Sequence, residues 1–352
     1  MEIVWRNPEA AFERLVLAGD VGGTNTNLAL VGETGGRFVI VLEAVFASRD
    51  LTCLSEPIHK LLELGRAKRP DLTPSRACIS AAGPVTANRC TMTNLSWGVD
   101  GPALAAEFGI VVRVINDFLA IGYGIPTLDV NDPAQIAVLT HPDGSCPPPQ
   151  ATTKAVIGPG TGLGVGFLAW DGRRYIPASS EGGHILFAPW DDDTRSFQEY
   201  LARRFDRTPG VEPFVSGLGI ANLYEWWRDV KGLPKGEAWQ QIEAAPSSQR
   251  PPLISKLSET DGTAAAMLSL FARMLGRFGG DIASVFLPLG GLYLAGGVAQ
   301  KQLRWIEHEH QFVRAFEQSY NPNLVKMLRQ VPIYLIRDYA ISLYGAANAA
   351  LS

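Results

Sequence analysis

The sequence predicts an α/β protein built from two lobes. The chain has 352 residues, and a single hydrophobic core stops growing at roughly 250 to 300 residues, so two cores are expected. Two glycine-rich segments, Asp20–Asn25 and Gly158–Gly164, lie far apart, and each is flanked on both sides by an apolar run typical of a strand. A strand–turn–strand hairpin that occurs twice indicates an approximate internal duplication.

The first half predicts a β-β-β-α-β succession. Three apolar runs predict strands, the next segment has the residue spacing of a helix, and a short apolar run at the end predicts a buried strand. In order, these segments are Leu15–Ala18, Leu28–Val31, Arg37–Phe46, Leu54–Leu64 and Arg76–Ser80. A short helix over Gly101–Gly109 and a strand over Val111–Ile115 come next.

The second half starts in the same way, with predicted strands over Ala155–Ile157 and Val165–Ala169. The proline-rich connector His141–Lys154 cannot be helical, so the second domain begins close to it. Later residues predict an inner strand, surface loops around short helices, and three helices, of which the last folds back onto the first lobe. These segments are Leu292–Ala295, Lys231–Gly262, Thr263–Phe286, Gln302–Phe316 and Ile341–Leu351.

Composition favours a small-molecule partner. The formal charge of −4 argues against a general nucleic-acid surface. The four cysteines form no Cys-x-x-Cys pair, and no apolar stretch reaches the ~20 residues that a membrane span needs. The opening Met1–Arg14 lacks the long apolar stretch of a secretory signal, so we expect a cytoplasmic protein that binds neither nucleic acid nor membrane.

The two glycine turns predict two phosphate clamps that face one another. Glycine lets backbone N–H groups approach a phosphate closely, and Thr24 and Thr161 add hydroxyl donors. Asp20, at a strand end, offers the oxygen ligand that Mg²⁺ prefers, although an aspartate before two glycines is by itself usually only a turn residue. Neither segment matches a Walker or Rossmann phosphate-binding pattern.

Asp117 follows a strand ending Val-Ile-Asn116, and ligand groups in open α/β sheets lie at such carboxyl ends. It is a candidate general base that takes a proton from an attacking hydroxyl. The alternative is an N-cap of the following helix, since asparagine and aspartate both cap well.

Glu181-Gly-Gly-His184 places a carboxylate and an imidazole around two glycines, a set that suits a polyol because it can accept and donate to sugar hydroxyls. A structural histidine, or half of a metal site, are the alternatives. Gly296-Gly297 ends an apolar strand and permits close approach by a flat ring or by a helix. The pair Trp226-Trp227 is predicted to be core or interface.

The chain resembles bacterial-type glucokinases of the hexokinase/actin-like ATPase superfamily, over Leu15 to Ala346. The resemblance is carried by the order and spacing of Asp20-Val-Gly-Gly-Thr-Asn25, Ala82-Gly-Pro-Val85, Met92-Thr-Asn-Leu-Ser-Trp97, Ile115-Asn-Asp-Phe118, Gly160-Thr-Gly-Leu-Gly164, Glu181-Gly-Gly-His184, Arg277-Phe-Gly-Gly280 and Leu294-Ala-Gly-Gly-Val298. It implies two ribonuclease-H-like lobes with a cleft between them. The small lobe is residues 1–117 joined by the C-terminal helix 339–352, and the large lobe is residues 118–338.

The resemblance also implies ATP-dependent phosphorylation of glucose at its 6-hydroxyl, with Asp117 as the base and a homodimeric assembly. The implied sugar-binding residues are Asn116, Asp117, Glu181, His184 and Glu212, where Glu212 would otherwise count as an ordinary surface carboxylate. The implied ATP-binding residues are Asp20, Gly22, Gly23, Thr24, Asn25, Gly160, Thr161 and Gly162 for the phosphates, with Mg²⁺ at Asp20, and Gly296 and Gly297 near the adenosine.

One position departs from the family pattern: Asn27 stands where the family commonly has an arginine. Weakened catalysis and a phosphoryl donor other than ATP, such as polyphosphate, therefore stay open. So do a kinase for another hexose and a non-catalytic sugar sensor. Repressors of the related repressor/ORF/kinase group carry a DNA-binding extension and a cysteine-rich zinc motif, whereas only 19 residues precede Asp20 and no cysteine follows Cys146. An actin-like filament or chaperone ATPase would not need the polyol set.

Overall fold

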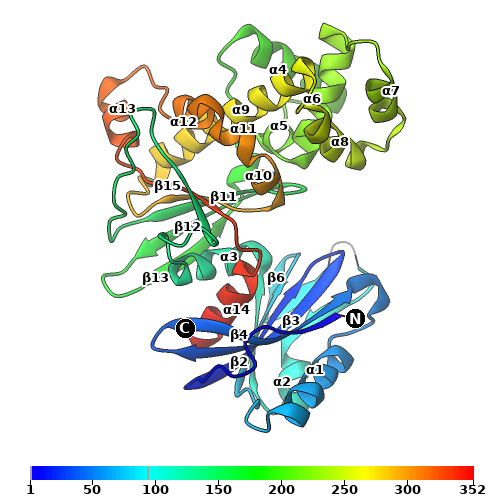
Figure 1. Cartoon of the computed structure of the whole chain (residues 1–352), viewed down its shortest axis with the longest axis vertical. Coiled ribbons are helices and arrows are strands. Elements are labelled where there is room, and N and C mark those ends of the chain that lie inside the picture. Colours follow the sequence, from blue (N-terminus) through cyan, green and yellow to red (C-terminus); the bar gives the residue numbers. More distant parts are fainter. Residues whose placement is uncertain (1, 93–94) are drawn as a thin grey trace. The chain divides into compact units, whose positions relative to one another are not determined.

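The computed structural model describes residues 2–92 and 95–352, so Thr93 and Asn94 of the segment Met92–Trp97 lie outside the described residues. Its contacts divide the chain into two compact units (Figure 1). The first comprises Met1–Asp129, Tyr175–Ala178 and Asp338–Ser352, and the second comprises Val130–Arg174 and Ser179–Arg337. None of the helices within the described ranges is both long and apolar enough to cross a membrane.

The first unit is built on a six-stranded sheet with the order β1-β4-β3-β2-β5-β9. Its first four strands pair antiparallel, whereas β2, β5 and β9 run parallel. The strands are β1 (Glu2–Trp5), β2 (Arg14–Val21), β3 (Asn25–Thr34), β4 (Arg37–Ala47), β5 (Arg76–Ala81) and β9 (Val111–Asn116), with β6 (Val85–Thr86), β7 (Arg89–Thr91) and β8 (Gly98–Asp100) in a small separate sheet. The helices are η1 (Ser48–Asp50), α1 (Ser55–Lys68), α2 (Gly101–Phe108), α3 (Asp117–Gly124), η2 (Ile125–Thr127) and α14 (Ile341–Leu351).

The C-terminal helix α14 packs on the sheet of the first unit and against α3 (Figure 1). Small residues permit this close approach, because a side chain at Gly345 would run into the backbone carbonyl of Ala120. Arg113 on β9 donates to the carbonyl oxygen of Ala349 at 3.0 Å. These contacts place α3 in the first unit, which therefore continues past Asp117 to Asp129.

The second unit repeats the same strand plan. Its sheet has the order β10-β15-β14-β11-β12-β13, in which β11 pairs antiparallel with β12 and parallel with β14. The run β13-β12-β11-β14-β15 thus matches β4-β3-β2-β5-β9 strand for strand. The strands of this sheet are β10 (Ile136–Leu139), β11 (Lys154–Pro159), β12 (Leu163–Trp170), β13 (Tyr175–Ser180), β14 (Leu292–Leu294) and β15 (Ile333–Ile336). Of β13, the division by contacts assigns Tyr175–Ala178 to the first unit. This shared order is what the repeated hairpin in the sequence predicts.

Helices make up most of the remainder of the second unit. They are η3 (Gly182–His184), α4 (Asp192–Phe205), α5 (Glu212–Val215), α6 (Gly217–Trp226), η4 (Trp227–Lys231), α7 (Glu237–Ala244), η5 (Ser247–Gln249), α8 (Arg250–Leu257), α9 (Gly262–Phe286), α10 (Gly297–Lys301), α11 (Leu303–Glu307), η6 (His308–His310), α12 (Gln311–Phe316) and α13 (Pro322–Leu328). The long α9 and the buried side chain of Trp226 agree with the predictions.

The prediction of a single helix over Gln302–Phe316 is wrong. Glu309 and His310 have φ angles of 49° and 54°, in the left-handed region that no α-helix continues through. The apolar spacing of the segment survives this break, because Ile306 on α11 and Phe312 on α12 are both buried in the same core. The periodicity of the sequence therefore marks the buried face but not the kink.

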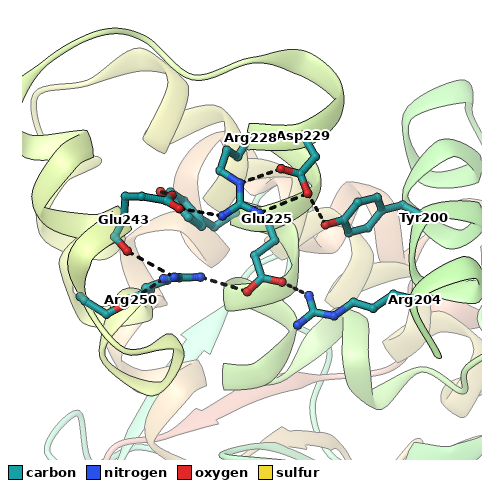
Figure 2. A network of polar contacts seen from close by, with 9 residues as sticks. Tyr200, Arg204, Glu225, Arg228, Asp229, Glu243 and Arg250 are labelled. Carbon is teal, nitrogen blue, oxygen red and sulfur yellow. Dashed lines mark hydrogen bonds and ion pairs between the residues drawn. The ribbon is translucent and has the colours of Figure 1, made fainter.

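A network of charged side chains fixes helix α6 of the second unit (Figure 2). Glu225 near the end of α6 is buried and pairs with Arg204 of α4 and with Arg250 of α8, the latter at 2.9 Å. Arg228 and Glu243 extend the network toward α7. Because the first residue of α6 contacts the second glycine turn, this network is part of what holds that turn in place.

Candidate active site

Asp20 is the next-to-last residue of β2, directly before the first glycine turn. Its register partner on β5 is Ser80, whose Oγ donates to Asp20 Oδ1 at 2.9 Å and also contacts the carbonyl oxygen of Gly19. Burial, with a smaller contribution from the nearby charge of Asp117, raises the pKa of Asp20 to about 6, against the opposing effect of the hydrogen bond from Ser80. Two carboxylates are therefore brought together at the carboxyl ends of the parallel strands β2 and β9.

The first turn is held from one side by a single serine. The Gly22 N–H donates to the carbonyl oxygen of Asn25 at 2.9 Å. Ser48 Oγ donates to the carbonyl oxygen of Gly22 at 2.6 Å, and the Ser48 N–H donates to that of Thr24 at 2.9 Å. Gly23, Thr24 and Asn25 stay exposed. The exposed part of the turn is thus the part predicted to meet a phosphate.

Asn116 and Asp117 both accept hydrogen bonds at the N-terminus of α3, and Asn116 is the capping residue. Asn116 is the N-cap of α3, with its Oδ1 accepting from the N–H groups of Phe118 and Leu119 at 3.0 and 3.4 Å. Asp117 Oδ1 accepts from the same Phe118 N–H at 2.8 Å. Burial nevertheless raises the pKa of Asp117, which outweighs these hydrogen bonds. A half-buried carboxylate with a raised pKa is a stronger base than an exposed one.

In the second unit the turn between β11 and β12 is held by helices α5 and α6. The Gly160 N–H donates to the carbonyl oxygen of Gly162 at 2.8 Å, and the Gly217 N–H donates to that of Gly160 at 2.8 Å. Glu212 Oε2 accepts from the Leu163 N–H at 2.8 Å. A Cβ atom at Gly162 would run into this carboxylate, so glycine is needed there, whereas Thr161 is exposed.

The remaining predicted residues of the second unit lie around the same turn. His184 Nε2 lies 3.6 Å from Glu181 Oε2, with both side chains exposed. A Cβ at Gly183 would collide with the carbonyl oxygen of Leu163, so the Glu181–His184 segment packs directly on the turn. Gly296 has a φ of 91°, and a Cβ there would lie 2.8 Å from the carbonyl oxygen of Pro159. Gly297 follows at the start of α10.

Each unit thus collects its own share of the predicted residues. Those of the first unit are Asp20, Gly22, Gly23, Thr24, Asn25, Asn116 and Asp117, and those of the second are Gly160, Thr161, Gly162, Glu181, His184, Glu212, Gly296 and Gly297. Sequence reasoning missed Ser48 and Ser80. The one signal for Ser80 is that it ends a predicted strand that could run parallel to the strand of Asp20, and Ser48 carries no signal at all.

The carboxylate of Asp20 fits a magnesium ion. Mg²⁺ takes oxygen ligands, keeps several waters, and is usually bound through one or two carboxylates together with substrate phosphates. Ser80 holds Oδ1 and thereby fixes the carboxylate. Residues 2–92 and 95–352 contain no group of three or more histidine, cysteine or acidic side chains able to hold a metal.

A sequence model described as Glucokinase matches residues 17–352. The chain belongs to the glucokinase family. The glucokinase of Nostoc punctiforme is 35% identical over 351 residues, which is 96% of this chain and 98% of that relative. The resemblance on which the sequence analysis relied is therefore confirmed.

Solved structures confirm the fold class of this glucokinase-family chain. The crystal structure of a glucokinase from an Antarctic psychrotroph aligns with a TM-score of 0.80 at 30% identity, over 96% of this chain and 98% of that one. A ROK family glucokinase from Streptomyces griseus, crystallised with glucose and AMPPNP, aligns with a TM-score of 0.59 at 20% identity, over 96% of this chain and 99% of that one. The fold is the α/β fold of hexokinases and actin-like ATPases that the resemblance implies.

Proposed function

We propose that this protein transfers the γ-phosphoryl group of ATP to the 6-hydroxyl of glucose, with Asp117 as the general base. The observation that carries the proposal is the grouping of Asp20, Ser80, Asn116 and Asp117 at the carboxyl ends of three parallel strands, where open α/β sheets bind ligands. Family membership supports the reaction. The glucose and AMPPNP bound to the Streptomyces griseus enzyme support the two substrates.

The residues take distinct roles in this proposal. Asn116, Glu181, His184 and Glu212 bind glucose hydroxyls, in keeping with their mix of donors and acceptors. The exposed parts of the two glycine turns bind the phosphates, and Gly296 and Gly297 lie near the adenosine. Asp20 would hold Mg²⁺, whose positive charge would neutralise that of the phosphates.

Asp117 accepts the proton of the 6-hydroxyl as this oxygen attacks the γ-phosphorus in line with the leaving ADP oxygen. Phosphoryl transfer passes through a largely dissociative transition state, so positioning and charge neutralisation supply most of the rate. Burial raises the pKa of Asp117, although hydrogen bonds from the Phe118 N–H and the Asn116 amide oppose the shift, and a carboxylate with a raised pKa is a better proton acceptor.

The first experiment is a coupled assay of glucose 6-phosphate formation from glucose, ATP and Mg²⁺ by the purified protein. Robust turnover is expected, with mannose and glucosamine competing less well. A parallel reaction contains polyphosphate in place of ATP as the phosphoryl donor. Tight glucose binding without turnover on either donor would overturn the kinase and leave a sugar sensor.

The substitution Asp117→Asn tests the base. Turnover is expected to fall by about 10²- to 10⁴-fold, the usual contribution of a general base. Glucose binding, followed by calorimetry, is expected to change little because asparagine keeps the shape and an acceptor oxygen. A variant with wild-type turnover would exclude Asp117 from proton transfer.

We also propose that the protein is a cytoplasmic homodimer, as the family resemblance implies. Light scattering coupled to gel filtration measures the mass directly. A mass equal to that of one 38.0 kDa chain would contradict the dimer.

A further inference from the structure

A polar pocket of about 410 Å³ lies within the first unit, at the opposite end of strands β2 and β5 from Asp20. Arg14, the first residue of β2, and Arg76, the first residue of β5, both line it, together with Thr73 and Ser75. Phe12 and Leu351, the last residue of α14, contribute apolar walls. A pocket of this volume is large enough for a small metabolite rather than for a bare ion.

The pocket offers one cationic side chain that the protein leaves unpaired and a second that it uses only in part. The side chain of Arg76 is exposed and makes no hydrogen bond or ion pair with any described residue. Arg14 uses its Nε to bind Glu33 Oε2 at 2.6 Å, an interaction that leaves its two terminal amino groups free to bind a ligand. Guanidinium groups of this kind bind phosphate and carboxylate oxygens with charge-assisted hydrogen bonds.

The acidic residues of the pocket are only partly available. Asp71 uses both of its carboxylate oxygens on Arg69, at 3.2 and 2.5 Å. Glu33, behind Arg14, spends its oxygens on Arg14 and on the Gly36 N–H. Glu13 lines the pocket close enough to Arg14 for its charge to raise the pKa of that arginine, and its side chain makes no hydrogen bond with the described residues. The groups available to a ligand are therefore the guanidinium group of Arg76, the terminal amino groups of Arg14, one carboxylate and two hydroxyls.

Other contacts give the pocket fixed walls before any ligand arrives. Arg69 donates from Nη1 to the carbonyl oxygens of Pro8 and Ala10, each at 2.9 Å, and stacks over the ring of Phe12. Phe12 in turn packs on Gly32 of β3, where a Cβ atom would lie 2.8 Å from the Phe12 Cβ. The segment before β2 is thus anchored to the loop after α1, and the arginines extend from the ends of a rigid sheet.

We propose that this pocket binds a small oxyanion that also carries hydroxyl groups, of which a phosphate ester of a polyol is the simplest class. The phosphate would be bound by Arg14 and Arg76, and the ligand hydroxyls by Glu13, Thr73 and Ser75. A bare anion would gain from the arginines but would be opposed by the charge of Glu13, whereas a hydroxylated ester uses that carboxylate as an acceptor. The site is separate from the candidate active site and does not rest on the proposed function.

Titration calorimetry with glycerol 3-phosphate tests the site, in the presence of saturating glucose, Mg²⁺ and AMPPNP so that the glycine turns are occupied. The variant Arg76→Gln removes the free cation. Arg66→Gln is the matched control, because Arg66 is an exposed arginine of the same unit, outside the pocket and without a partner among the described residues. Both arginines lack protein contacts, so neither substitution is expected to change folding.

We expect wild type and Arg66→Gln to bind glycerol 3-phosphate equally, and Arg76→Gln to bind at least about tenfold more weakly, as loss of one charge-assisted hydrogen bond implies. Glu13→Gln is expected to strengthen the binding of inorganic phosphate and to weaken the preference for the ester. Absence of binding to wild type would overturn the proposal. So would equal binding by the two arginine variants, or displacement of the ester by AMPPNP.

Discussion

The two glycine turns of this chain have the same strand plan but different supports. In both, the N–H of the first glycine closes the turn, at 2.9 Å to Asn25 and at 2.8 Å to Gly162. The first turn follows a half-buried carboxylate, Asp20, and is held by Ser48. The second follows Pro159 and is held by Glu212 and by the start of α6.

This difference shows how one hairpin serves two tasks. Placing the carboxylate of Asp20 where burial disfavours its charge lowers the free energy of unfolding of the first unit, since the pKa of Asp20 is raised to about 6. The second unit has no such carboxylate in its strand. It ties its turn to Glu212, a predicted sugar-binding residue, so that the predicted phosphate and sugar contacts share one hydrogen-bonded support.

The largest expected effect comes from Asp20→Asn. Turnover with ATP is expected to fall about 100-fold or more, because several kcal/mol of metal-mediated charge stabilisation are lost. The metal-free protein is expected to gain on the order of 1–3 kcal/mol at pH 8, because asparagine keeps an acceptor for Ser80 without a buried charge. Activity and thermal unfolding in EDTA measure the two effects.

The pH dependence of that gain follows from the raised pKa of Asp20. Between its usual value of 3.8 and about 6, the folded protein binds a proton that the unfolded chain does not, so ionisation lowers the stability of wild type as pH rises. The gain of Asp20→Asn is therefore full above pH 6 and shrinks toward pH 4. A gain that is equal at pH 4 and pH 8 would refute the account based on charge.

Glu212 tests whether the second turn and the sugar site share a support. Glu212→Gln keeps an oxygen for the Leu163 N–H but loses the charge, so KM for glucose is expected to rise about tenfold with KM for ATP nearly unchanged. Glu212→Ala also frees that N–H and is expected to raise both constants. Steady-state kinetics separate the variants, and a glucose KM unaffected in both would remove Glu212 from the sugar site.

Ser48→Ala is expected to have a smaller effect, confined to the first turn. Its side chain is fully buried and bonds both the Gly22 carbonyl oxygen and Thr26 Oγ1, so its loss costs about 1–3 kcal/mol in free energy of unfolding and raises KM for ATP a few-fold. Ser284→Ala is the control, because Ser284 donates to a helix carbonyl oxygen in α9. Equal changes in KM for both variants would show that the effect is not local to the turn.

Much of this fold can be predicted from local sequence patterns. Apolar runs around glycines predict the hairpins β2–β3 and β11–β12, and their repetition predicts the matching strand orders, because a strand's alternation and a turn's glycines are both read within a few residues. The local sequence pattern does not predict the positive φ angles of Glu309 and His310, because neither residue type requires them and the apolar residues around them have helical spacing.

The supports of the site escape sequence reasoning for a different reason. Ser80 matters because the β2–β5 register puts it beside Asp20, and Ser48 matters because β4 delivers it to the first turn. These are pairings between residues 26 to 60 positions apart, fixed by the whole sheet. The resemblance to glucokinases supplied Glu212, whose contact with the second turn only the structure displays.

The smallest expected effect tests the one departure from the family pattern. Asn27 is the register partner of Asp20 on β3, so both side chains lie on the same face of the sheet. No cation is among the causes that set the pKa of Asp20. Asn27→Arg is therefore expected to lower that pKa and to stabilise the metal-free protein by about 1 kcal/mol or less at pH 8.

Charge attraction makes this gain conditional on an ionised Asp20. Below about pH 4 the carboxylate of the folded protein is protonated, so the gain is expected to vanish there, and it is expected to vanish at every pH in the double variant with Asp20→Asn. Asn27→Gln controls for side-chain length. Thermal unfolding in EDTA at both pH values measures wild type, the three single variants and the double variant, and a gain that persists without Asp20 would show that arginine at this position acts through packing instead. In that case the absence of the family arginine would say nothing about how the first turn holds its charge.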